Sequence, residues 1–457
     1  MAKAPASTLD NVIALAKKRG FVFQAGEIYG GSRSAWDYGP LGVELKENIK
    51  RQWWRTFVQS RGDMVGLDSS IILPKRVWEA SGHVATFVDP LVECKSCHNR
   101  FREDHLLEAF EAKKGRAPET GLAEIACPNC GTRGEFTDPQ QFSGLVKTYL
   151  GPVDSEAGLH YLRPETAQGI FVNFLNVVTA TRQKPPFGIG QVGKAFRNEI
   201  TPGNFIFRTR EFEQMEMQFF VKPGTDEDWF EQWREIRMKW HVDLGLRAER
   251  LRWHAHGPGE LAHYAKAAYD IEYEFPFGWQ EIEGVHNRTD FDLSRHQEYS
   301  GKKLEYFDPA TSERYIPYVV ETSAGADRVT LTVMADAYRE EEVEGETRVV
   351  MGFNPAVSPI KAAVLPLTRK DGLPEVADRL YHDIRRRWSA FYDDSGAIGR
   401  RYRRQDEVGT PWCITIDHDT LSEETVTIRE RDAMTQVRIA TSQVQAWIAD
   451  RLEEAGR

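Results

Sequence analysis

Alternating polar and apolar residues along Val192–Met217 predict two strands joined by a short turn. Side chains alternate across a strand, so one face of the second strand is expected to pack into a core: Phe205, Phe207, Met215, Met217 and Phe219. The opposite face of that strand is mostly polar and carries Ile206, Arg208, Arg210, Phe212, Gln214 and Glu216. The segment Thr201–Asn204, Thr-Pro-Gly-Asn, predicts the turn, so the two strands are expected to be antiparallel neighbours.

The polar face of this hairpin has the composition of a nucleotide site. Arg197 and Glu199 share a face of the first strand and add to the charged set. Planar guanidinium groups bind phosphate oxygens through paired hydrogen bonds, and an exposed ring offers a purine a stacking surface. The alternative is a half-exposed hairpin whose arginines and glutamates pair with one another. That alternative leaves the position of Phe212 among charges unexplained.

Apolar residues at helical spacing predict two N-terminal helices. The first ends at Gly20 and buries the face made by Val12, Ile13, Leu15 and Ala16. The second repeats its apolar residues every four positions, and an extended segment ending at Pro74 follows it; its apolar residues are Leu41, Leu45, Ile49, Trp53 and Phe57. Three prolines within Gly352–Leu367 predict a linker, which divides the chain into residues 1–354 and 355–457.

Composition narrows the class of protein. The 457 residues are 41% hydrophobic and 28% charged, as expected for a soluble protein of two or three domains. No apolar run is long enough to span a membrane and no secretory signal is recognisable, so the sequence predicts a cytoplasmic protein without membrane contact. The net charge of −10 argues against a globally basic nucleic-acid-binding protein.

Any contact with RNA therefore depends on a local basic patch. The segment Arg379–Arg404 holds eight arginines against three aspartates, including the runs Arg385–Arg387 and Arg400–Arg404. Tyr402 within the second run offers a ring for stacking on an unpaired base. A solvated helix face followed by a charged loop is the alternative interpretation.

Four cysteines predict a metal site within an insertion of about residues 91–150. They form two C-x-x-C pairs separated by 29 residues: Cys94, Cys97, Cys127 and Cys130. Four thiolates favour tetrahedral zinc, and four protein ligands leave no open position for a substrate, so the role would be structural. The long spacing weakens the pattern, and reduced redox pairs or vestigial thiols are the alternatives. Cys413 lies in an apolar strand and is predicted to be a buried small residue.

Three segments together resemble the signature motifs of class II aminoacyl-tRNA synthetases, in the form found in glycyl-tRNA synthetases of the homodimeric type. Phe196–Glu199 (FRNE) followed by Phe207–Phe212 (FRTREF) resembles motif 2. Asp37–Gly42 (DYGPLG), with the helix and the extended segment to Pro74, resembles motif 1, and Val319–Arg328 (VVETSAGADR) resembles motif 3. The resemblance covers essentially the whole chain.

The resemblance implies a fold, a reaction and partners. The expected fold is α/β (α+β): an antiparallel class II catalytic sheet flanked by helices, a cysteine-rich insertion, and a C-terminal α/β anticodon-binding domain. The implied reaction joins glycine to ATP as glycyl-adenylate and passes the glycyl group to the 3′ end of tRNA(Gly). The implied cofactor is Mg²⁺ with the ATP, beside the structural zinc that the cysteines predict, and the expected assembly is a homodimer with Leu41–Pro74 in its interface.

The resemblance also implies roles for residues of the hairpin and of motif 3. Arg197 is expected at the α-phosphate and the glycine carboxylate, Arg328 at the γ-phosphate just before a helix, and Phe212 under the adenine ring. Glu281 resembles the acidic residue associated with ATP-bound Mg²⁺; an exposed strand pair with Glu283 on the same face is the alternative. The remaining residues expected near ATP are Asn198, Glu199, Phe207, Arg208, Thr209, Arg210, Glu211, Ile282, Gly325, Ala326 and Asp327.

A second carboxylate set implies how glycine is selected. Glu165, Glu216 and Glu321 are expected around one small ammonium group, with Ser323 on the same face as Glu321. A larger amino acid would be rejected by steric overlap, so no editing domain is needed on that account. Arg102 matches a substrate-binding position of the family, and a salt bridge to Asp104 is the alternative. Further residues expected at the substrate are Phe212, Glu213, Gln214, Met215, Thr322, Ala324 and Gly325.

Two other functions are compatible with parts of the sequence. A synthetase-derived ligase that loads a carrier protein would make the adenylate, but the arginine cluster of the C-terminal segment disfavours it. A non-enzymatic RNA-binding protein derived from a synthetase would not need Arg197, Glu199, Phe212 and Arg328 together. Glycine-dependent exchange between ATP and pyrophosphate separates an enzyme from a binding protein.

Overall fold

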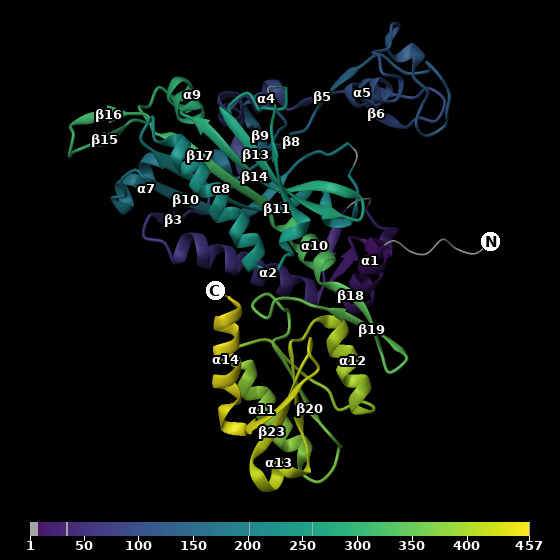
Figure 1. The fold of residues 1–457 in the computed structure, drawn as a ribbon. Coiled ribbons are helices and arrows are strands. Elements are labelled where there is room, and N and C mark those ends of the chain that lie inside the picture. Colours follow the sequence, from purple (N-terminus) through teal and green to yellow (C-terminus); the bar gives the residue numbers. More distant parts are fainter. Residues whose placement is uncertain (1–7, 33–34, 201, 258, 457) are drawn as a thin grey trace.

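The computed structural model describes residues 8–32, 35–200, 202–257 and 259–456. Figure 1 shows a large upper body, a small module projecting from it, and a lower domain built from the C-terminal part of the chain. Within the described ranges no helix is both long and apolar enough to cross a membrane.

The upper body is built on a seven-stranded sheet in the order β12-β13-β14-β17-β11-β10-β3. Neighbouring strands are antiparallel except for β10 and β3, which are parallel. The predicted antiparallel core is therefore confirmed. The strands are β3 (Met64–Gly66), β10 (Phe187–Phe196), β11 (Glu211–Val221), β12 (Leu251–Ala255), β13 (Ala267–Phe275), β14 (Gly278–Thr289) and β17 (Tyr318–Gly325).

Helices cover one face of this sheet with an aromatic-rich core. Met215, Met217 and Phe219 of β11 are fully buried there, as the alternation predicts. The Phe219 ring lies 5.2 Å from Trp233, and Trp233 lies 6.2 Å from Phe57. The second predicted helix is confirmed and continues into a π-helical turn, Arg55–Gln59. The covering helices are α1 (Thr8–Arg19), α2 (Pro40–Trp54), α8 (Asp226–Asp243) and α10 (Ala326–Ala337).

The connection between β10 and β11 differs from the predicted strand–turn–strand. The two strands pair in register from Phe187↔Phe220 to Phe196↔Glu211, but residues 197–210 lie outside both strands. Phe205–Phe207 forms a 3₁₀ turn in which three consecutive side chains are buried, so the predicted strand and the predicted exposure of Ile206 are wrong. Phe205 and Phe207 are buried, and Arg208 and Arg210 are exposed, as predicted. Positive φ angles at Asn204 (54°) and Phe205 (60°) are incompatible with an extended strand. Thr201 of the predicted turn lies outside the described residues.

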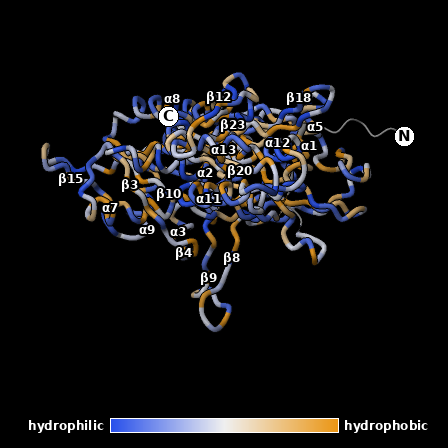
Figure 2. Tube along the Cα trace, turned by 90° about the horizontal axis from the view of Figure 1, so that it is seen from below, coloured by the Kyte–Doolittle hydropathy of each residue, from blue (hydrophilic) through white to orange (hydrophobic). Residues whose placement is uncertain are grey.

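Smaller elements surround the sheet. A three-stranded sheet, β4-β9-β8, carries an arm of β8 and β9 that projects from the body in Figure 2. Its strands are β4 (Ile72–Pro74), β8 (Val146–Tyr149) and β9 (Leu159–Leu162). The other elements here are β1 (Val22–Gln24), β2 (Trp36–Tyr38), α3 (Lys75–Ala80), α4 (His83–Thr86), α6 (Ala167–Val172), α7 (Phe174–Thr181), α9 (Phe291–Ser300), β15 (Tyr306–Asp308) and β16 (Glu313–Tyr315).

The projecting module contains the cysteines. Its strands pair in the order β6-β5-β7, which joins residues 88–91 to residues 140–143. The closed unit therefore runs from Val88 to Ser143, because β8 pairs with β9 of the body and not with the module. The elements of the module are β5 (Val88–Glu93), β6 (Arg100–Arg102), α5 (Glu103–Lys114) and β7 (Gln140–Ser143).

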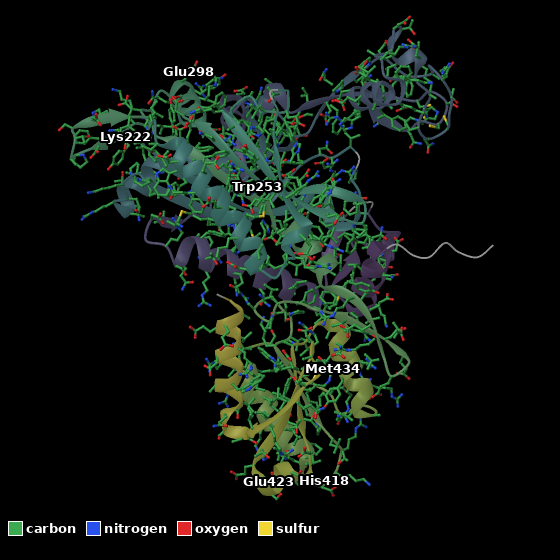
Figure 3. All side chains as sticks on the ribbon, viewed as in Figure 1. Lys222, Trp253, Glu298, His418, Glu423 and Met434 are labelled. Carbon is green, nitrogen blue, oxygen red and sulfur yellow. The ribbon has the colours of Figure 1, made fainter. Side chains whose placement is uncertain are left out.

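The lower domain is an α/β unit with its own core. Its five-stranded sheet has the order β21-β20-β22-β23-β24, parallel on both sides of β20 and antiparallel elsewhere. Figure 3 labels His418 and Glu423 of α13 at its far end. The elements are β20 (Ala362–Pro366), α11 (Leu373–Arg385), β21 (Ala390–Tyr392), α12 (Ile398–Val408), β22 (Trp412–Ile416), α13 (His418–Glu423), β23 (Thr425–Glu430), β24 (Gln436–Ala440) and α14 (Val444–Ala455), preceded by the hairpin β18 (Tyr338–Val343) and β19 (Glu346–Met351).

Candidate active site and metal centre

A cavity of about 230 Å³ opens on the sheet face opposite the aromatic core. Three adjacent strands, β11, β17 and β14, form its floor; Glu216 pairs across to Ser323, which pairs to Gly284. Fifteen of the residues predicted from the sequence line it: Glu165, Arg197, Glu199, Phe207, Arg208, Thr209, Phe212, Gln214, Glu216, Glu281, Glu321, Ser323, Gly325, Asp327 and Arg328. The structure therefore brings most of the predicted ATP and glycine residues to one cavity.

Arg197 lies directly after β10 with its guanidinium group at the cavity wall. Its Nε donates to the carbonyl oxygen of Pro164 at 3.0 Å, and its guanidinium carbon lies 5.4 Å from the centre of the Phe212 ring. Its two terminal nitrogens donate no hydrogen bond to any of the described residues. These terminal nitrogens are consequently available to an anionic ligand.

Arg328 lies in the first turn of α10, not before the helix as predicted. Its Nη1 lies 3.0 Å from Oε2 of Glu281 and also donates to the Glu281 carbonyl at 3.1 Å. Its Nε donates to the carbonyl of Phe207 at 3.2 Å, and its guanidinium lies 4.5 Å from the Phe207 ring. These contacts hold Arg328 between the loop and β14, at the edge of the cavity.

A β-bulge separates Glu281 from Glu283. Glu272 of β13 pairs with Glu281, whereas Ile271 pairs with Glu283, so the register shifts by one residue. Glu281 consequently lines the cavity, and Glu283 is fully buried on the other face with Arg237 and with His241 at 2.7 Å. The predicted shared face of the two glutamates is wrong. Burial opposes ionisation of Glu283, but Arg237 and His241 lower its pKa to about 2.

Three buried carboxyl groups meet at one end of the cavity. Oε2 of Glu165 lies 3.3 Å from Nε2 of His83. Thr166 donates to Oε2 of Glu216 at 2.6 Å, and Gln218 donates to both Glu216 (2.8 Å) and Glu321 (2.6 Å). Ser323, on the same face as Glu321 as predicted, accepts from Gln214 at 3.2 Å.

The three carboxyl groups differ in their ionisation. Burial favours the neutral acid, but Arg288 and His286 outweigh it at Glu321 and lower its pKa to about 2. His83 likewise outweighs burial at Glu165 and holds its pKa well below the usual range. Burial raises the pKa of Glu216 well above its ordinary value, and the charges of Glu321 and Glu165 add to the rise. Glu216 is therefore the member of the cluster whose charge is least compensated, and it favours the neutral acid.

Several residues that build this cluster were not predicted. Arg288 is 1% exposed and holds Asp292 through two hydrogen bonds (2.7 and 2.9 Å) and Glu321 through one (3.0 Å). Nδ1 of His286 lies 2.9 Å from Oε1 of Glu321, and Tyr264 lines the cavity beside them. No local signal distinguished Arg288, because β14 is itself largely polar (GWQEIEGVHNRT); only the packing shows that this arginine is buried among carboxylate partners.

Ten predicted residues lie outside the cavity lining. Alternation explains several of them, because neighbouring strand positions face the aromatic core or α2. Glu213, for example, lies 2.6 Å from Lys46 and 2.9 Å from Lys50 of α2. Arg102 lies in β6 and is paired with Asp89 (2.9 Å) and Asp104 (2.5 Å), the salt bridge considered above. The others are Asn198, Arg210, Glu211, Met215, Ile282, Thr322, Ala324 and Ala326, and their predicted roles stay predictions.

The four cysteines form one cluster in the projecting module. Their sulfur atoms all lie within 4.8 Å of one another, with 3.7 Å between Cys94 and Cys130 and 3.7 Å between Cys97 and Cys127. The two C-x-x-C turns have the same backbone pattern: His98 donates to the Cys94 carbonyl at 2.8 Å, and Gly131 donates to the Cys127 carbonyl at 2.9 Å. This paired arrangement of four sulfur donors fits one metal ion.

The predicted basic patch is only partly exposed. Arg401 is 2% exposed and donates to the carbonyls of Pro366 (2.7 Å) and Asp393 (3.0 Å), so the prediction that it contacts RNA is wrong. The Tyr402 hydroxyl lies 2.7 Å from Thr415, and Arg404 pairs with Asp393 at 2.6 Å. The amphipathic α12 turns these side chains toward the domain core. The exposed members of the patch are Arg379, Arg385, Arg386, Arg387 and Arg400.

Comparison with known proteins places this architecture. Residues 153–338 match the tRNA synthetase class II core domain (G, H, P, S and T), and residues 361–451 match the anticodon binding domain. The glycine–tRNA ligase of Thermobifida fusca (strain YX) is 58% identical over 457 residues, which cover 98% of this chain and 99% of that protein. That of Streptomyces coelicolor is 59% identical over 455 residues, with 98% of this chain and 99% of that protein covered.

The antiparallel sheet, the cavity and the two matched domains together define a class II aminoacyl-tRNA synthetase. At this identity, over nearly the full length of each relative, the chain belongs to the glycine–tRNA ligase family.

Proposed function

We propose that this chain activates glycine with ATP to form glycyl-adenylate and pyrophosphate, and then transfers the glycyl group to the 3′ end of tRNA(Gly). The observation that carries the proposal is the carboxyl cluster of Glu165, Glu216 and Glu321 next to Arg197 in one cavity. Acidic groups attract a free ammonium group, and an arginine fork binds carboxylate and phosphate oxygens. The two relatives described above are glycine–tRNA ligases, which supports the same substrates.

The first step requires no general base, because the carboxylate of glycine is already ionised at neutral pH. It requires two anions held together while negative charge moves onto pyrophosphate. Arg197 would hold the glycine carboxylate and the α-phosphate, and Arg328 the γ-phosphate. Phe212 would stack under adenine, with Glu199 and Arg208 near the edge of the adenine ring or near the phosphates. A purified protein that showed no glycine-dependent ATP–pyrophosphate exchange, and no charging of total tRNA with glycine, would refute the proposal.

Mg²⁺ would be held with the ATP by Glu281. The carboxylate of Glu281 is a hard oxygen donor at the cavity, and burial together with the charge of Glu281 raises the pKa of nearby Asp270. A divalent cation would relieve this concentration of negative charge. When bound, Mg²⁺ neutralises charge on the phosphate oxygens.

We also propose the organisation of the chain and its assembly. Residues 1–354 would form the catalytic domain, with the metal-binding insertion, and residues 355–457 the anticodon-binding domain of a cytoplasmic enzyme. A homodimer of the α2 type, with Leu41–Pro74 in its interface, is supported by apolar side chains exposed on β4 (Ile72, 38%) and on the arm (Leu150, 47%; Val153, 66%). Light scattering that returned a fully active species of 52.2 kDa would rule the dimer out.

Glycine binding should release roughly one proton from Glu216 at neutral pH. The pKa of Glu216 is raised in the free protein, so its proton is retained until the ammonium group of glycine favours the carboxylate. Affinity should accordingly rise as the pH rises through that raised pKa and then level off. Calorimetry in two buffers of different ionisation enthalpy measures the proton. Glu216→Gln should abolish the release and weaken binding; Glu211→Gln, on an exposed glutamate of the same strand, should change neither.

The cysteine cluster should hold one structural zinc ion. Cys127→Ser should release the metal and loosen residues 88–143, because the free energy of metal binding is also free energy of folding. Elemental analysis and hydrogen exchange measure the two effects. Cys413→Ala removes the buried thiol of the other domain and should leave the metal content unchanged. Parent protein purified without chelator and free of zinc would contradict the assignment.

The exposed arginines at the end of α11 should contact tRNA. Charge reversal by Arg386→Glu and Arg387→Glu should weaken tRNA binding. It should also reduce the slope of log K against log salt concentration by roughly one unit per lost phosphate contact. Glycine-dependent exchange needs no tRNA and should be unchanged. Lys302→Glu with Lys303→Glu reverses two exposed charges of the catalytic body as a control. Unaltered tRNA affinity at near-physiological salt would show that these arginines form an ordinary solvated surface and do not contact tRNA.

A further inference from the structure

We propose that Tyr264 is a specificity-determining residue, the side wall that restricts the amino-acid end of the cavity to a substrate without a side chain. The inference rests on the proposed glycine activation and names a residue outside all three sequence motifs. Tyr264 lies in the loop between β12 and β13, and it lines the same cavity as Glu165, Glu216 and Glu321.

The Tyr264 ring packs against the guanidinium group of the buried Arg288. The guanidinium carbon of Arg288 lies 3.7 Å from the ring centre, and Arg288 is itself fixed by Asp292 and Glu321. His286 packs against the ring with 6.2 Å between ring centres, and Phe291 with 6.4 Å. A ring supported on several sides cannot move aside without disrupting a buried ion pair.

The hydroxyl group of Tyr264 belongs to the cavity. Burial raises the pKa of Tyr264 well above its ordinary value, so the hydroxyl stays neutral throughout the physiological range. Among the residues that the structure describes, none forms a hydrogen bond with this hydroxyl, and its oxygen is not fully buried. The ring therefore presents a neutral, rigid surface with an accessible polar edge beside the acidic cluster.

The support of this wall is shared with the carboxyl cluster. Arg288 packs against Tyr264 and donates to Oε2 of Glu321 at 3.0 Å. A substrate with a methyl group on its α-carbon would press on the Tyr264 ring and, through Arg288, on a carboxylate expected to bind its ammonium group. Rejection of a larger amino acid would thus combine steric overlap with loss of ammonium binding.

The test compares alanine with glycine in ATP–pyrophosphate exchange. Tyr264→Ala should raise the kcat/KM ratio of alanine to glycine by roughly tenfold or more, because it opens space for a methyl group. Tyr264→Phe keeps the wall and should preserve the parental ratio. Glu260→Gln is the matched control and should also preserve it, because Glu260 is an exposed residue of the same loop whose carboxylate contacts Gly257 and His254.

A parental ratio in Tyr264→Ala, or equal relaxation in Tyr264→Phe, would overturn the proposal. If Tyr264→Ala supports no exchange, calorimetry gives the affinities of the variant and of the parent for glycine and for alanine. An alanine-to-glycine affinity ratio equal to that of the parent would refute the proposed role of Tyr264. Failure of the proposed function is recognised separately, because the parent protein would then show no glycine-dependent exchange.

Discussion

Replacement of Arg197 by lysine should lower glycine-dependent ATP–pyrophosphate exchange by roughly two orders of magnitude or more. Nε of Arg197 is engaged by the Pro164 carbonyl, which directs the remaining nitrogens of a rigid plane at the cavity. Lysine keeps the charge, but its single ammonium nitrogen cannot contact the Pro164 carbonyl at the position of Nε and also present two coplanar donors to the ligand. The substitution should lower kcat as well as raise KM, because the paired guanidinium nitrogens are needed when negative charge shifts at the α-phosphate.

A matched substitution separates this effect from a general loss of arginine. Arg76 also donates to a backbone carbonyl, that of Tyr299 at 2.6 Å, but it lies outside the cavity. Arg76→Lys should leave exchange within about twofold of the parent. If Arg197→Lys exchanged pyrophosphate at the parental rate, Arg197 would not be the residue that contacts the α-phosphate. Circular dichroism of both variants checks that the fold is retained.

Alternation along the strands predicted much of the site. The buried face of β11 (Met215, Met217, Phe219) and the cavity face with Phe212 and Glu216 were both correct, because β11 pairs without interruption with β10 and β17. A period of two assigns faces only while the register is continuous. It failed at the bulge before Glu283 and at the 3₁₀ turn after Asn204, where the backbone leaves the extended conformation.

Charge counts were less informative than alternation. The arginine-rich segment predicted an exposed basic surface, yet Arg401 is buried on backbone carbonyls. Arg288, which supports both Glu321 and Tyr264, was missed because its partners come from a helix and from another strand. A guanidinium group can be solvated by water or by carbonyl oxygens, and which of these applies depends on tertiary packing.

Removal of the Arg288 cation should be the most destabilising of the substitutions considered. Arg288→Met should cost about 3–5 kcal/mol of catalytic-domain stability, because two buried carboxylates lose the charge that compensates them. Denaturant unfolding followed by tryptophan fluorescence measures the cost. Arg295→Met, on a more exposed arginine of the same helix as Asp292, removes a partly solvated pair with Glu298 and should cost below about 1 kcal/mol.

The pH dependence of the stability lost in Arg288→Met identifies the cause of that loss. Glu321 has a pKa lowered to about 2, so the stability that it contributes is present above its unfolded pKa and is lost as the pH falls toward 2. Without Arg288 that pKa should rise. The difference between parent and Arg288→Met should therefore be largest near neutral pH and should shrink as the pH falls below about 4. A deficit that stayed constant from neutral to acid pH would indicate lost packing against Tyr264 and Phe171 instead of lost charge compensation.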